Sequence, residues 1–177
     1  MEFYHEGMRE LQDRYEGRDV PDRLADNRMR RAFNAEDREC IETSPFFFLS
    51  TAADESVDSS FKGGEPGFVR VTGDNTLAWP DYDGNRMYRS LGNILRNPRV
   101  GLLFVRFDGK TFNNAGRLRI NGHAQIDDRP EAIEGLPGAK RMIRVRAEYI
   151  YTNCPRYIPK LATEKSSVYS PRETYSP

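Results

Sequence analysis

A lysine followed by two glycines is the first group of residues that could do chemistry. Lys62 and the pair Gly63-Gly64 come after the hydroxyl of Ser60 and before the apolar pair Phe68-Val69. Glycines allow the backbone to approach a flat or anionic ligand closely. The same pattern is compatible with an ordinary glycine-rich turn whose lysine is solvated. The segment is therefore a candidate ligand-binding loop.

A second candidate segment leads from a predicted strand into a predicted helix. Residues 79–86 read Trp-Pro-Asp-Tyr-Asp-Gly-Asn-Arg. If a helix begins here, its free N–H groups and the positive end of its dipole suit a phosphate. The alternative is that Asn85 only caps the helix. The polar side chains near this predicted helix start are Arg86, Arg89, Ser90 and Asn93.

A third candidate is the run Asn-Cys-Pro-Arg-Tyr at residues 153–157. Cys154 has no second cysteine nearby to resolve a redox reaction, so we interpret it as a small buried residue at the end of a strand. Arg156 is the better candidate for a ligand contact, because a guanidinium group suits phosphate and carboxylate.

Most familiar catalytic arrangements are missing from the sequence. It has no GxGxxG after a strand, no P-loop and no Ser–His–Asp set, because His123 has no obvious partner. The two histidines and the two cysteines, Cys40 and Cys154, do not have the spacing of metal ligands. We therefore name no catalytic residue and no metal, and we expect a cofactor that brings its own chemistry.

The elements that must position these residues begin with a helical segment at residues 1–43, for which the pattern predicts three helices. Pro21 suits the first turn of the second helix, and Asn34 suits the N-cap of the third. The apolar residues at helical spacing in the first helix are Met8, Leu11 and Tyr15.

Residues 44–160 change to strand patterns around one helix, which we expect at residues 86–96. We count about six strands, and their spacing predicts a mostly β fold with helices (α+β) in which the strands form an antiparallel barrel. The pair Asn121-Gly122 is either a tight hairpin turn or a bulge within one long strand. A hairpin turn is predicted at 73–75 and a loop at 80–84. Strand patterns lie at residues 46–51, 57–61, 68–71, 76–79, 99–107, 117–126 and 143–147.

The composition bounds the class of protein. The 177 residues fit a single domain at 1–177, with a mobile tail at 161–177. The 27 basic and 27 acidic residues cancel, so no global field would attract nucleic acid or an anionic membrane. Because the sequence shows neither a signal peptide nor a long apolar run, we expect a cytoplasmic protein with reduced thiols.

Short motifs in fixed order cover roughly residues 4–160. They include FFFLST at 46–51, KGG at 62–64, PGFVRV at 66–71, LAWP at 77–80, DGN at 83–85, SLGN at 90–93, NPRVGLLF at 97–104, LRING at 118–122 and NCPRY at 153–157. Together they resemble the flavin-nucleotide-binding proteins of the pyridoxamine 5′-phosphate oxidase-like superfamily.

This resemblance implies a six-stranded split β-barrel that forms a homodimer with two FMN molecules at the subunit interface. It places the strand at 68–71 along the isoalloxazine ring and favours a bulge at Asn121-Gly122. Lys62, Asn85, Ser90 and Asn93 would lie toward the ribityl phosphate, and Arg156 would reach the flavin of the other subunit. The cofactor-binding residues that it implies are Ser60, Lys62, Gly63, Phe68, Val69, Arg70, Trp79, Asp81, Tyr82, Asn85, Ser90, Asn93 and Arg156.

One departure from the resemblance concerns the substrate. Oxidases of pyridoxamine phosphate carry an Arg–His pair near the C-terminus, whereas this chain has no histidine after His123. We therefore expect an FMN-dependent oxidoreductase that acts on a small molecule other than vitamin B6. The alternative is a non-enzymatic carrier or sensor, and a deazaflavin (F420) could replace FMN. A nucleic-acid contact through Arg28, Arg30 and Arg31 is a third reading, which the acidic neighbours Asp19, Asp22 and Asp26 weaken.

Overall fold

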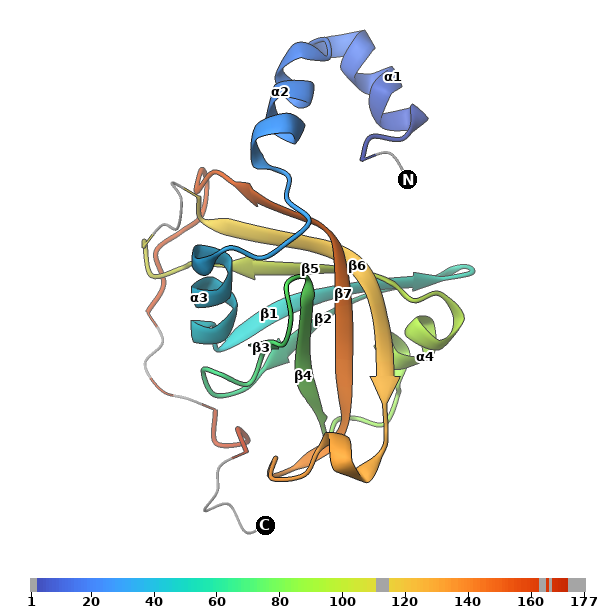
Figure 1. Cartoon of the computed structure of the whole chain (residues 1–177), viewed down its shortest axis with the longest axis vertical. Helices are drawn as coiled ribbons and strands as arrows, with labels where there is room; N and C mark the ends of the chain where they lie inside the picture. The colour runs from blue at the N-terminus through green and yellow to red at the C-terminus, as the bar shows by residue number, and fades with distance from the viewer. Residues whose placement is uncertain (1–2, 111–114, 163–164, 166, 172–177) are drawn as a thin grey trace.

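One curved antiparallel sheet forms the body of the protein (Figure 1). The computed structural model describes residues 3–110, 115–162, 165 and 167–171. Neighbouring strands pair in the order β2-β1-β5-β6-β7-β4-β3. Their bounds are β1 (Phe46–Ala53), β2 (Ser56–Gly63), β3 (Arg70–Val71), β4 (Thr76–Tyr82), β5 (Arg99–Val105), β6 (Arg117–Asp127) and β7 (Ala139–Asn153).

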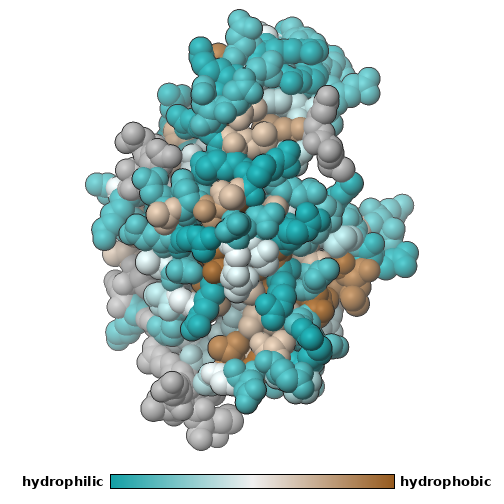
Figure 2. All heavy atoms as spheres, in the orientation of Figure 1, coloured by the Kyte–Doolittle hydropathy of each residue, from teal (hydrophilic) through white to brown (hydrophobic). Residues whose placement is uncertain are grey.

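The described part of the chain therefore has seven strands, one more than the predicted count of about six, and each overlaps one of the strand patterns found in the sequence. The sheet is open rather than closed, because its edge strands β2 and β3 do not pair with each other. Figure 2 shows that the face of the molecule seen in this view is mostly hydrophilic, with small hydrophobic areas between.

The helical N-terminal segment forms as predicted. α1 (Glu6–Tyr15) and α2 (Asp19–Arg28) stand away from the sheet in Figure 1, whereas α3 (Ala35–Thr43) lies beside it. Asn34 is the N-cap of α3, and its side chain and that of Asp37 form a reciprocal capping box. No helix in the described ranges is long and apolar enough to cross a membrane.

The core lies on the inner face of the sheet, where alternate side chains point. Phe47, on β1, stacks on Phe104, with ring centroids 5.1 Å apart, and meets Trp79 edge-on at 5.0 Å. All three rings are almost completely buried. Aromatic burial of this size is a main source of stability and holds β1, β4 and β5 together.

Several predicted boundaries were wrong, and the strand expected at 143–147 is the much longer β7 (Ala139–Asn153). The strand expected at 68–71 begins only at Arg70, because the backbone N–H of Phe68 closes a turn onto the carbonyl of Glu65. β4 runs through the loop expected at 80–84 as far as Tyr82. The helix expected at 86–96 is α4 (Arg89–Arg96), because Arg86 and Tyr88 have φ angles of 62° and 52°, which a right-handed helix excludes.

Asn121 and Gly122 lie within the long strand β6, not in a hairpin turn, and the register with β7 shifts between them. The extra residue of this bulge is on β7, because Glu148 has no opposite residue on β6. A side chain at Gly122 would place its Cβ within 2.2 Å of the carbonyl oxygen of Arg146. Glycine is therefore required here by the close approach of β7.

Candidate functional site

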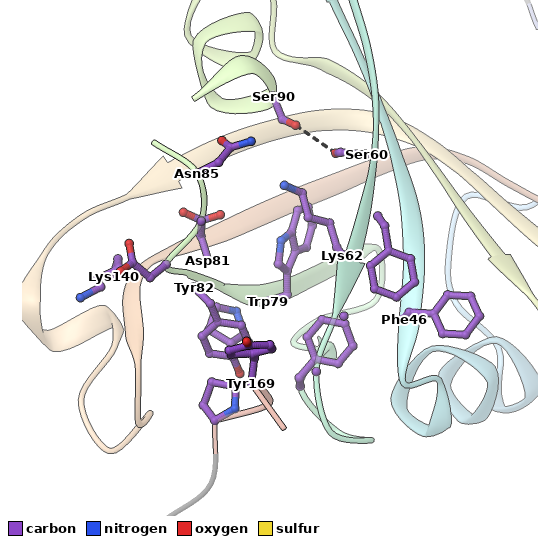
Figure 3. A pocket seen from close by; sticks show the side chains of 18 of the residues that line it. Phe46, Ser60, Lys62, Trp79, Asp81, Tyr82, Asn85, Ser90, Lys140 and Tyr169 are labelled. Atoms are coloured by element: carbon purple, nitrogen blue, oxygen red, sulfur yellow. Dashed lines mark hydrogen bonds between the residues drawn. The ribbon is translucent and has the colours of Figure 1, made fainter. Parts of the chain in front are cut away.

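A cavity of about 960 Å³ lies between β2, β4, the start of β7, the 83–88 loop and the first turn of α4 (Figure 3). Tyr169 and its neighbours in the described C-terminal residues line it as well. This volume is at the upper end of the range for small-molecule sites.

A chain of hydrogen bonds joins β2 and α4 at one end of the cavity (Figure 3). The hydroxyl of Ser90 donates to the Asp58 carboxylate at 2.7 Å, and the hydroxyls of Ser60 and Ser90 lie 3.0 Å apart. Arg89 approaches the other Asp58 oxygen at 3.4 Å. Ser60 and Asp58 are alternate residues of β2, so both point to the same side of the sheet.

A bulge between β4 and β7 shapes another wall. Asp81 pairs with Arg141 and Tyr82 with Ala139, which leaves Lys140 without an opposite residue. In a regular strand two consecutive side chains would point to opposite faces, but the bulge allows both Lys140 and Arg141 to line the cavity.

Asp81 is the most buried carboxylate in this wall. Its side chain is 15% exposed, and one carboxylate oxygen lies 3.7 Å from the Arg141 guanidinium. Burial raises the pKa of Asp81, and the nearby charges of Lys62 and Arg141 lower it by less. Burial likewise raises the pKa of Tyr82. Arg141 also lies over the ring of Tyr88, 5.4 Å from its centroid.

Trp79 lies beneath these groups and is 1% exposed. Its indole N–H is buried and has no hydrogen-bond partner within the part of the chain that the structure describes. Orphaned buried donors are rare in proteins and need an explanation, such as a bound water or ligand that completes the bond.

The lining of the cavity is positively charged although the whole chain is neutral. Among the described residues that line it, six are basic and three are acidic. An anionic ligand is therefore favoured. The basic residues are Lys62, Arg86, Arg89, Lys140, Arg141 and Lys165, and the acidic ones are Asp58, Asp81 and Asp83.

The structure brings most of the predicted cofactor-binding residues to this cavity. Val69 lies in the core, Arg70 is exposed and donates to the carbonyl of Gly67, and Asn93 is buried and donates to Thr51. Arg156 is exposed beyond the end of β7 and does not line the cavity of its own chain. The predicted residues that do line it are Ser60, Lys62, Gly63, Phe68, Trp79, Asp81, Tyr82, Asn85 and Ser90.

Sequence reasoning missed four groups of the site: Asp58, Tyr88, Lys140 and Arg141. Alternation along residues 58–62 could have identified Asp58, since it shares a face with Ser60 and Lys62. Lys140 and Arg141 depend on the bulge, which leaves no signal in the sequence. No group of three or more potential ligands placed to hold a metal ion is found in the ranges described.

Two of the arginines considered for nucleic acid are used within the protein. Arg30 pairs with the buried carboxylate of Asp37. Arg31 lies over the ring of Tyr149 and donates to the carbonyl of Glu148.

Fold and site together define a domain built on an open antiparallel sheet, with a basic cavity at the ends of its strands. A family model described as pyridoxamine 5′-phosphate oxidase matches residues 33–166, so the chain belongs to this family. α1 and α2 precede the matched region.

Solved structures support the fold. A candidate pyridoxamine 5′-phosphate oxidase from Lactobacillus delbrueckii is 16% identical, with a TM-score of 0.51, over 70% of this chain and 96% of that one. HupZ from Group A Streptococcus is 14% identical, with a TM-score of 0.50, over 73% of this chain and 99% of that one. At these identities the similarity extends to the fold alone. No curated protein matches the chain significantly.

Proposed function

We propose that the protein binds FMN in the basic cavity and acts as a flavin-dependent oxidoreductase on a small molecule. The observation that carries this proposal is a cavity with an excess of positive charge in a member of the pyridoxamine 5′-phosphate oxidase family. When bound, the flavin would supply the electron transfer.

The residues present fit such a cofactor. Lys62 and the other basic side chains of the lining suit a phosphate group. The unpaired N–H of Trp79 is a donor that a carbonyl oxygen of a flavin ring would satisfy after a small movement of the neighbouring side chains. Asp81 is the carboxyl group of the cavity whose pKa burial raises, so it keeps a proton to higher pH than an exposed aspartate does and is the candidate to hold or release one beside the ligand.

The proposed assembly is a homodimer, and the outer face of the sheet supports it. The strand registers place Tyr151, Arg119, Leu103, Phe48 and Phe61 in one row across five strands. Phe61 is 61% exposed. Four of the five side chains are aromatic or apolar, and only Arg119 is charged. A mostly apolar row of this kind is typical of a surface that a second copy covers.

Phe46, beside this row, stacks on Phe61, and both residues also line the cavity. A second copy on this face would therefore lie next to the ligand, where its Arg156 could reach it. Light scattering at micromolar protein should give the mass of a dimer. A monomer that still binds FMN would contradict this assembly.

The experiment that tests the cofactor is purification followed by extraction and mass spectrometry of any bound molecule. FMN and a deazaflavin differ in mass and in visible spectrum, so both readouts separate them. Reduction of the bound flavin by a nicotinamide donor would support the oxidoreductase. Bound FMN that no donor reduces would instead favour a carrier or sensor, and a protein that binds neither cofactor would refute the proposal.

A further inference from the structure

The hydroxyl groups at the Asp58 end of the cavity have a fixed direction of hydrogen bonding. An ionised carboxylate only accepts, so in the 2.7 Å contact with Asp58 the Ser90 hydroxyl must be the donor. A hydroxyl has a single hydrogen. In the 3.0 Å contact between the two serines, the hydrogen therefore comes from Ser60.

Because Ser60 donates to Ser90, its hydroxyl has no hydrogen left to donate to a ligand in the cavity. The only other described contact of its hydroxyl, to the carbonyl oxygen of Leu49 at 3.5 Å, would use the same hydrogen. Ser60 can present only oxygen lone pairs to a ligand, and Ser90 has already given its hydrogen to Asp58. This end of the cavity is thus an acceptor site with a carboxylate behind it, which repels a phosphate.

We propose that Ser60 accepts a hydrogen bond from a hydroxyl of the ligand's polyol chain, and that the phosphate lies instead at the basic side chains elsewhere in the cavity. This inference rests on the proposed binding of FMN, whose ribityl chain carries such hydroxyls. It also reverses the role that the resemblance suggests for Ser90, which here orients Ser60 rather than binding phosphate.

The substitution Asp58→Asn reverses the direction of the hydrogen bonds that join Ser60, Ser90 and residue 58. Arg89 can only donate, so the amide oxygen of Asn would face Arg89 and its NH₂ would face Ser90. Ser90 would then donate to Ser60, and the hydrogen of Ser60 would be free to point into the cavity or to the carbonyl oxygen of Leu49. A ligand hydroxyl that donates to Ser60 would then compete with Ser90 for the lone pairs of Ser60, so this hydrogen bond should be weakened.

The test compares the dissociation constants of FMN, riboflavin and lumiflavin, which lacks the polyol chain, for the intact protein and its variants. Ser60→Ala should weaken FMN and riboflavin alike, by roughly 3- to 10-fold, the equivalent of one neutral hydrogen bond. Asp58→Asn should weaken riboflavin by a similar factor and FMN by less, because this variant also removes the negative charge that opposes the phosphate. Lumiflavin should change by less than about 2-fold, because the bond to a ribityl hydroxyl is absent from it.

Matched controls lie in turns away from the cavity. Thr72→Ala removes an exposed hydroxyl in the turn between β3 and β4, which does not line the cavity. Asp54→Asn removes an exposed carboxylate 3.7 Å from Arg96, away from the cavity. Neither control should change any of the three constants.

The outcomes separate this inference from the function on which it rests. A wild-type protein that binds no flavin refutes both. If the wild type binds FMN but Ser60→Ala weakens FMN and not riboflavin, the phosphate lies at Ser60 and the inference is wrong. An equal loss for lumiflavin would place a ring N–H there and would also overturn it.

Discussion

Removal of the Lys62 amino group tests where the phosphate of the cofactor lies. Lys62 is on β2, two residues from Ser60 and on the same face, and its charge acts on Asp81 within the cavity. A charge-assisted contact to phosphate contributes about 1.5–3 kcal/mol. Lys62→Ala should therefore raise the dissociation constant of FMN by roughly 10- to 150-fold. Riboflavin has no phosphate and should lose little.

The assay is a titration that follows the quenching of flavin fluorescence. Lys62→Arg keeps the charge and should retain most of the affinity for FMN. Lys110→Ala, an exposed lysine that does not line the cavity, should have no effect. Equal losses for FMN and riboflavin at Lys62 would move this residue away from the phosphate. If neither affinity falls, Lys62 does not contact the ligand and is a solvated lysine.

Further predictions concern the cavity, the thiols and the assembly. Trp79 is the single tryptophan and lines the cavity, so FMN binding should quench protein emission excited at wavelengths that select tryptophan. Burial raises the pKa of Asp81 in the folded protein above the ordinary value of 3.8. The folded state is therefore favoured by protonation of Asp81: this contribution to the free energy of unfolding is complete below pH 3.8 and is lost as the pH rises through the raised pKa. Without ligand, Asp81→Asn should therefore have a higher urea midpoint of unfolding than the wild type at pH 7, and the two midpoints should coincide below pH 3.8. A lower midpoint for Asp81→Asn at pH 7 would contradict this. Burial raises the pKa of the Cys40 thiol to about 12. The predicted burial of Cys154 was wrong: Cys154 is exposed, and its pKa is lowered, first by a backbone hydrogen bond from Arg156. Mass spectrometry after alkylation of the native protein should find Cys154 modified and Cys40 intact. In the proposed dimer Arg156→Ala should weaken FMN and riboflavin together, in contrast to Lys62→Ala.

Much of the fold could be predicted because local signals and the packing agreed. The apolar spacing of Met8, Leu11 and Tyr15 predicted α1, and Asn34 predicted the start of α3. The apolar run in β5 identified a strand in the interior of the sheet. In each case the sequence pattern and the tertiary environment favour the same conformation.

The boundaries that could not be predicted depend on contacts far along the chain. Pro80 is tolerated inside β4 because β3 pairs no further than Ala78, so no strand needs its missing N–H on that side. The left-handed conformations of Arg86 and Tyr88 oppose the local preference of both residues and delay the start of α4. Propensity gives no indication of either feature.

The site residues on regular strands could be predicted from the sequence, whereas those at the bulge between β4 and β7 could not. Ser60 and Lys62 share a face by simple alternation, and Trp79 and Asp81 do the same on β4. Lys140 and Arg141 reach the cavity together only through the irregular pairing of β4 with β7. That pairing is a property of two distant segments and cannot be read from either one alone.

The same pairing has a consequence for how the chain folds. β4 lies directly beside β7, although β5 and β6 separate them in the sequence, and their ladder joins Thr76 to Arg146. Closing such a long loop costs entropy before any contact offsets it, so pairings of this kind form slowly. Asp81 and Arg141 meet only when this last ladder is complete. A chain growing from its N-terminus therefore acquires its ligand site only after β7 has been made, and ligand binding would report completion of the sheet rather than guide its early assembly.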